Sequence, residues 1–219
     1  MLAIINTWQF NLFFSLIFGI LSYQYYKLAI RNVKEDGAVT IILQLIASLS
    51  VLIWMPLFNF KFPTNLKIYL LLFLATIFYT INDRLQTTVR KHLEVSVLSV
   101  INQLSNIFII IIGLTIFREP LLISKIIGVI LILLGNVYLL YRKGRLDLNK
   151  YVILTIISNL AFSIAISTDI GISKLFNLPI YISITLIIPA FIIKIIEKIP
   201  AYTIIKEYEN GEKKYFYAT

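Results

Sequence analysis

The sequence predicts an all-α protein, a polytopic bundle of about seven transmembrane helices, from its composition and from the spacing of its apolar runs. Of the 219 residues, 59% are hydrophobic and only 14% are charged, and the mean hydropathy is +0.87. Soluble domains contain about 45–50% apolar and about 25% charged residues. The apolar residues gather in runs of about 20, the length that crosses a bilayer as a helix.

The first three predicted spans are residues 8–28, residues 38–57 and a run that starts at residue 66. Because residues 1–7 carry no Lys or Arg, we expect the first span to be retained and not cleaved as a signal peptide. The third run is apolar only to Ile81, which gives about 24 Å at the helical rise of about 1.5 Å per residue. To cross a core of about 30 Å, this helix must continue through Asp83 and Arg84.

The other four predicted spans are residues 95–117, 122–141, 151–174 and 178–196. Pro120 separates the first two of these, because proline cannot continue a helix without losing a hydrogen bond. The basic stretch 142–145 ends the next span. Pro189 lies inside the last span, where neighbouring helices can satisfy the carbonyl that it frees. The tail, residues 197–219, is too polar to span a membrane.

The distribution of basic residues predicts an orientation. Most of the 20 Lys and Arg residues lie near the ends of the first, third, fifth and seventh spans, which fall on one side of the membrane. Because cytoplasmic loops carry the excess of positive charge, this bias predicts an extracellular N-terminus and a cytoplasmic C-terminal tail.

The counts of reactive side chains argue against catalysis and metal binding. With no cysteine and one histidine, His92, the chain lacks the groups that form disulfides, common zinc sites and Ser–His arrangements. We therefore expect no enzymatic activity, no metal and no cofactor. The net charge is +9, and the Lys and Arg residues responsible for it lie in loops between apolar runs. Membrane topology accounts for that placement, so we expect the lipid bilayer and no nucleic acid as a partner.

Polar side chains recur at steps of three or four residues in the first four spans, which places them on one face of each helix. Such stripes can converge on a polar cavity for a small solute, or they can join helices by hydrogen bonds of about 0.6 kcal/mol each. We favour helix contacts for single Ser and Thr residues and a cavity for the amides and charges. The candidate cavity residues are Asn11, Gln44, Asp83, Arg84, Asn102, Gln103, Asn106 and Asp169.

Two carboxylates fall within predicted spans. A charge at the bilayer centre costs about 2.5–3.5 kcal/mol on insertion scales, so some interaction must offset that cost at Asp83. One interpretation is a contact with a solute or a proton, and the other is a position at the membrane interface. The same alternatives hold for Asp169, for which an interfacial position near Lys174 is favoured.

Four residues around the fourth and fifth spans are expected to be structural. Glu119 and Pro120 mark the turn between these spans. Gly128 and Gly135 lie seven residues apart on one helical face, which suits close packing of helices.

The stretch 95–141 resembles the EamA-like repeat of the drug/metabolite transporter superfamily, and the resemblance covers residues 66–141 best. In that family a long helix ends in a Gly-Glu-like step, and the next helix carries an Ile-Gly pair and a second glycine. The matching positions are Glu119, Ile127 with Gly128, and Gly135, whereas Arg118 replaces the glycine before the glutamate.

The resemblance implies a five-helix repeat that occurs twice in inverted orientation. Residues 1–145 would form the first repeat and residues 146–219 part of the second. The first and sixth spans both end in a lysine, Lys27 or Lys174, before an Asn-containing turn, as expected of repeat-built transporters. Family members usually keep the N-terminus in the cytoplasm, contrary to the charge bias, so the orientation stays open.

Together these features predict a multi-pass secondary transporter of the cell membrane. It would move a small metabolite or an amphipathic compound by alternating access. The alternative is a non-transporting membrane module that pairs with another membrane protein. A homodimer or a partner chain could then complete the second repeat.

Overall fold

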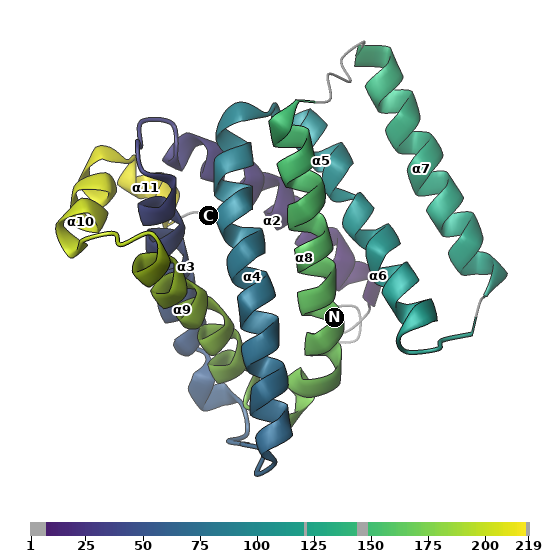
Figure 1. Cartoon of the computed structure of the whole chain (residues 1–219), viewed down its shortest axis with the longest axis horizontal. Helices are drawn as coiled ribbons and strands as arrows, with labels where there is room; N and C mark the ends of the chain where they lie inside the picture. Colours follow the sequence, from purple (N-terminus) through teal and green to yellow (C-terminus); the bar gives the residue numbers. More distant parts are fainter. Residues whose placement is uncertain (1–7, 121, 144–148, 218–219) are drawn as a thin grey trace.

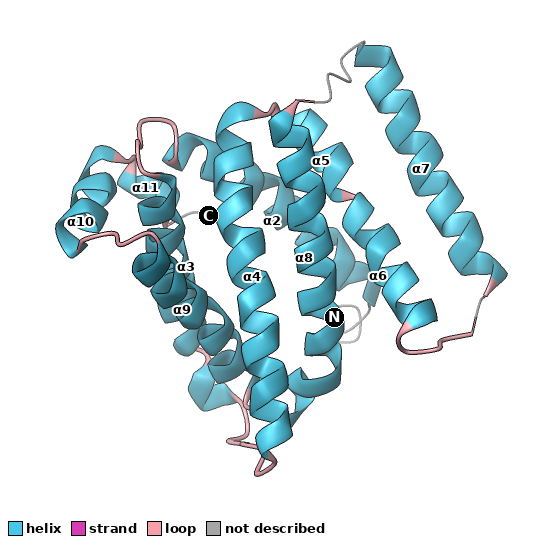
Figure 2. Cartoon of the chain, viewed as in Figure 1, coloured by secondary structure: helices cyan, strands magenta, loops and turns pink. Residues whose placement is uncertain are grey.

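The computed structural model describes residues 8–120, 122–143 and 149–217, and helices occupy all seven predicted spans (Figures 1 and 2). The described part contains helices and loops and no β-strand. The main helices of the predicted spans are α2 (Trp8–Ala29), α3 (Asp36–Leu52), α4 (Leu66–His92), α5 (Val95–Asn102), α6 (Leu104–Thr115), α7 (Ile123–Lys143), α8 (Lys150–Ile172) and α9 (Leu178–Ile196). The other described helices are η1 (Met55–Leu57), η2 (Ser173–Leu175), α10 (Ala201–Asn210) and α11 (Lys213–Phe216). The boundary proposed between residues 145 and 146 lies outside the described residues.

Five of the described segments are long and apolar enough to cross a membrane. They comprise α3 with η1, α4, α5 with α6, α8 with η2, and α9. The α2 helix has the length of a span, but its amides and tyrosines lower its hydropathy, and α7 contributes a shorter apolar stretch, Ile123–Gly135. The chain is therefore a multi-pass helical membrane protein.

The α4 helix confirms that the third span continues through its polar half. It runs unbroken for 27 residues, from Leu66 to His92, and includes Asp83 and Arg84. Asn65 caps its first turn by accepting a hydrogen bond from the amide of Lys67 at 3.0 Å. This length carries the polar residues into the interior of the bundle.

Two helix pairs form the centre of the bundle. The α4 helix packs along α8, and α3 packs along α9 (Figure 1). Small residues that are almost fully buried lie on these helices, namely Ala75 on α4 and Ala165 on α8, and such residues allow membrane helices to approach closely. The cavity described below lies beside these pairs.

The fourth predicted span is two helices, α5 and α6, with a break at Gln103. Polar side chains of α8 bind carbonyls beside the break. Asn159 donates to the carbonyl of Ile101 at 3.0 Å, and Ser163 donates to that of Ser105 at 3.0 Å. Because these carbonyls gain partners from α8, the span can bend without leaving them unpaired in the membrane.

The α7 helix stands apart from the helix pairs in Figure 1. No described atom lies within 4 Å of a Cβ built on Gly128 or Gly135. Contrary to expectation, these two glycines are therefore not sites of close helix packing within the described chain. The turn before α7 is held by an ion pair between Glu119 and Lys125 and by a 3.0 Å bond from the Glu119 amide to the Gly113 carbonyl.

Arg118 occupies the left-handed region of backbone conformation in this turn, with φ 51°. This is the position where the resembling family usually has glycine, and glycine adopts positive φ without steric cost. Arg118 therefore has a backbone conformation that glycine adopts more readily.

Replacing Arg118 with glycine should therefore stabilise the protein by about 0.5–1 kcal/mol, because the side chain no longer opposes positive φ. The measurement is equilibrium unfolding of the purified protein in detergent. Arg118→Ala, which removes the charge but keeps Cβ, serves as the control and should show no such gain. Equal stability of the glycine and alanine variants would contradict the backbone explanation.

Asn177 fastens the start of α9 to the loop between α3 and α4. Its side chain is 1% exposed. The side-chain amide donates to the carbonyls of Phe58 at 3.0 Å and Asn59 at 3.2 Å, and its oxygen accepts from the amide of Ile180 at 3.3 Å. The backbone amide of Asn177 also donates to the Lys61 carbonyl at 2.9 Å.

Candidate functional site

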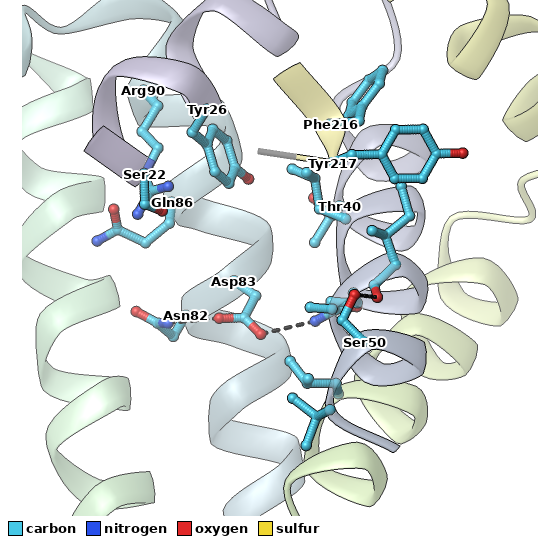
Figure 3. A pocket seen from close by; sticks show the side chains of 16 residues that line it. Ser22, Tyr26, Thr40, Ser50, Asn82, Asp83, Gln86, Arg90, Phe216 and Tyr217 are labelled. Atoms are coloured by element: carbon cyan, nitrogen blue, oxygen red, sulfur yellow. Dashed lines mark hydrogen bonds between the residues drawn. The ribbon is translucent and has the colours of Figure 1, made fainter. Parts of the chain in front are cut away.

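A cavity of about 530 Å³ lies between α2, α3, α4, α9 and α11 (Figure 3). Its wall combines polar side chains with aliphatic and aromatic ones, and it is lined by Ser22, Tyr26, Thr40, Leu43, Gln44, Ile46, Ala47, Ser50, Val51, Asn82, Asp83, Gln86, Arg90, Leu186, Phe216 and Tyr217. Its volume falls in the range of about 300–1,000 Å³ that is typical of small-molecule sites.

The polar faces of α3 and α4 meet at this cavity, as their residue spacing predicts. Thr40 donates to the hydroxyl of Thr87 at 2.7 Å, and Gln44 donates to Asp83 Oδ2 at 2.8 Å. From α2, the Tyr26 hydroxyl lies 2.6 Å from that of Thr87. These bonds hold three helices together and fix the orientation of the carboxylate.

Asp83 points from α4 towards α3 across the cavity (Figure 3). Its two oxygens accept hydrogen bonds from Gln44 and from Asn82, each at 2.8 Å. Among the described residues no basic side chain forms an ion pair with it. Two neutral amides therefore hold the carboxyl group of Asp83 in the cavity wall.

Polar atoms of the cavity wall also lack partners. Gln44 Oε1, Gln86 Oε1 and Arg90 Nε are buried and form no hydrogen bond within the described part of the chain. A buried donor or acceptor without a partner costs about 1–3 kcal/mol. A bound solute that satisfied these atoms would recover that free energy.

Arg90 brings positive charge to the cavity. It is not among the cavity residues predicted from the sequence. Its guanidinium lies over the rings of Tyr23 and Tyr26, 4.6 Å and 4.0 Å from their centroids. The spacing of Asp83, Gln86 and Arg90 places all three on one face of α4. Extending the polar stripe by one turn would have found this residue.

The structure brings two of the eight candidate cavity residues, Gln44 and Asp83, into the cavity wall. Asn102 lies next to the wall, where it accepts from Gln86 at 3.1 Å and donates to the Tyr23 hydroxyl at 3.0 Å. The remaining five do not line it.

Three of those five are exposed amides. Gln103 and Asn106 hydrogen-bond to each other at 2.8 Å beside the break between α5 and α6. Asn11 is exposed in the first half of α2. The polar stripe of α2 reaches the cavity only at Ser22 and Tyr26.

Arg84 belongs to an ion network outside the cavity. It pairs with Glu197 at the end of α9, lies 3.9 Å from Asp36 at the start of α3, and donates to Thr88 at 2.6 Å. Asp36 also pairs with Lys91. The network joins one end of α3, α4 and α9.

Asp169 forms a separate cluster that also joins three helices. Tyr79 of α4 donates to it at 2.6 Å, and Tyr181 of α9 donates to its second oxygen. The carboxylate is thus satisfied by two phenol groups and does not line the cavity. Its position supports contact between α4, α8 and α9.

The C-terminal helix α11 covers one side of the cavity. Phe216 is 1% exposed and packs in a core cluster with Ile30 of α2 and Val39 and Ile42 of α3. Figure 3 shows Phe216 and Tyr217 beside Thr40. The composition of this tail indicates only that it is too polar to span a membrane. Its contacts with α2 and α3 join segments that are distant in the sequence, so no local pattern predicts them.

Comparison with known proteins identifies one family. The model of the EamA-like transporter family matches residues 6–141, which include α2 to α6 and nearly all of α7. No curated protein matches the chain. The family match covers more than half of the sequence and agrees with the helical, multi-pass architecture. The chain therefore belongs to the EamA-like transporter family, part of the drug/metabolite transporter superfamily.

Proposed function

We propose that the protein is a secondary transporter of the cell membrane that carries a small metabolite or an amphipathic compound by alternating access. The observation that carries this proposal is the Asp83 carboxylate, which faces a cavity of about 530 Å³ without an ionic partner among the described residues. Family membership supports transport as the activity.

The cavity wall supports an amphipathic solute in particular. Asp83 and Gln86 provide polar contacts, whereas Leu43, Ile46 and Leu186 provide apolar ones. A solute with a polar group and a small apolar body would satisfy both parts of the wall. A polar group that binds the ionised form of Asp83 would be a hydrogen-bond donor, because an ionised carboxylate only accepts.

The two-repeat organisation is part of the same proposal. Residues 1–145 would form the first five-helix repeat, and residues 146–219 would belong to a second. The family match over residues 6–141 supports the first unit. Packing of α8 and α9 on α4 and α3 supports a cavity to which both units contribute.

Labelling of engineered cysteines tests alternating access directly, because the natural chain has no cysteine. Ala47 lines the cavity, so Ala47→Cys should react with a membrane-impermeant thiol reagent. In sealed vesicles this reaction should occur from either side of the membrane. The measurement is the labelled fraction by mass spectrometry after reagent is added to one compartment at a time.

Leu49→Cys is the matched control on the same helix. Leu49 is 64% exposed and does not line the cavity, so its thiol should face lipid, where the reactive thiolate is disfavoured. Equal labelling of both positions would refute a water-accessible cavity. Labelling of Ala47→Cys from one side only would contradict alternating access.

A further inference from the structure

A second cavity, of about 460 Å³, lies at the ends of α2 and α4 and is strongly basic. Four of its lining residues are Lys27, Arg31, Arg90 and Lys91, and none of its lining residues is acidic. The rest of the wall includes the apolar side chains of Leu28, Ile30 and Val33.

The charge in this second cavity is only partly compensated. Lys27 donates to the Leu93 carbonyl at 3.0 Å, and Lys91 pairs with Asp36. Within the described chain, Arg31 and Arg90 have no acidic partner. Neither guanidinium group therefore forms an ion pair within the described part of the chain.

Arg90 is held in position for a ligand. The stacking of its guanidinium on Tyr23 and Tyr26 restricts its orientation, while its buried Nε lacks a hydrogen-bond partner among the described residues. Guanidinium groups bind phosphate through paired N–H donors. A phosphate oxygen in the cavity would satisfy the unpartnered donor.

The position of the cavity indicates the source of the phosphate. Lys27 and Arg31 lie where α2 ends and the chain leaves an apolar run. Several tyrosines of α2 occupy the same level, as in the aromatic belt at a membrane interface. Basic pockets at this depth between membrane helices suit anionic lipid headgroups, and the apolar wall suits the adjoining glycerol and acyl groups.

We propose that this second cavity binds the phosphate-bearing headgroup of an anionic lipid. Arg31 and Arg90 contact the phosphate, Lys27 and Lys91 add positive potential, and Leu28 and Ile30 pack against the apolar part of the lipid. Arg90 lines both cavities, so the lipid and the transported solute would share this residue.

Titration of the full-length protein in detergent with phosphatidylglycerol or phosphatidylcholine, followed by native mass spectrometry, tests this proposal. One phosphatidylglycerol should bind at least about tenfold more tightly than phosphatidylcholine. Arg31→Gln should weaken that binding about fivefold, the effect expected for loss of one basic residue near an anionic lipid. Arg31 is exposed and has no acidic partner in the described structure, so this variant should fold normally.

Lys34→Gln is the matched control. Lys34 is exposed in the same loop, but its side chain does not line the second cavity. Lys34→Gln should leave the affinity for phosphatidylglycerol unchanged. Equal weakening by both variants, or equal affinity for the two lipids, would overturn the proposal. Displacement of phosphatidylglycerol by inorganic phosphate would assign the cavity to a soluble anion and overturn the lipid assignment.

Discussion

Asp83→Asn should lower the transport rate about 10- to 100-fold, because hydrogen bonds to a charged group contribute about 1.5–3 kcal/mol and the amide removes that charge. The side chain keeps its size, and the bonds that hold it to Gln44 and Asn82 can re-form in part. The measurement is uptake into proteoliposomes across a panel of organic cations, zwitterions and neutral amphipathic compounds.

Asp169→Asn is the control for this result. Asp169 is also a carboxylate within a span, but it contacts Tyr79 and Tyr181 and does not line the cavity. Its replacement should change transport much less than that of Asp83. Unchanged uptake of every transported solute by the Asp83 variant would remove this residue from the solute path.

Asn177→Ala should destabilise the protein by about 3 kcal/mol. The substitution removes an N-cap, worth about 1 kcal/mol, and leaves the carbonyls of Phe58 and Asn59 without their donor, at about 1 kcal/mol each. The measurement is the free energy of unfolding in mixed micelles. A denaturing detergent is added in increasing amounts, and circular dichroism follows the loss of helix.

Asn149→Ala provides a comparison of the same residue type in the same helical position. Asn149 caps α8 through the amides of Tyr151 and Val152 at 3.0 Å and 3.1 Å, but it is exposed. Its loss should cost about 1 kcal/mol. If both variants lost the same stability, the hydrogen bonds from Asn177 to the loop before α4 would contribute nothing to the free energy of unfolding.

The sequence predicts the spans well because hydropathy reports how long each apolar run is. The third span required one more argument, and its continuation through Asp83 followed from the length needed to cross the bilayer. The facing stripes of α3 and α4 were also predictable, since helical periodicity decides which residues share a face. Helical periodicity therefore predicts that Gln44 and Asp83 line one cavity, and in the structure their side chains are hydrogen-bonded.

Other features depend on contacts between distant segments. The break at Gln103 has no proline or glycine to mark it, and partners on α8 accommodate it. Phe216 reaches the cavity from a polar tail whose composition gives no sign of a buried position. Arg90 of α4 stacks on two tyrosines of α2, and this contact between distant segments draws it into the bundle.

The α3, α4 and α9 helices are clamped at both ends. Asn177 secures one end to the loop before α4, and Arg84 joins the other end through Asp36 and Glu197. We expect these contacts to limit the movement of the three helices relative to one another. Because the Tyr26 hydroxyl also joins α2 to Thr87 of α4, any change in the volume of the cavity would have to break some of these contacts.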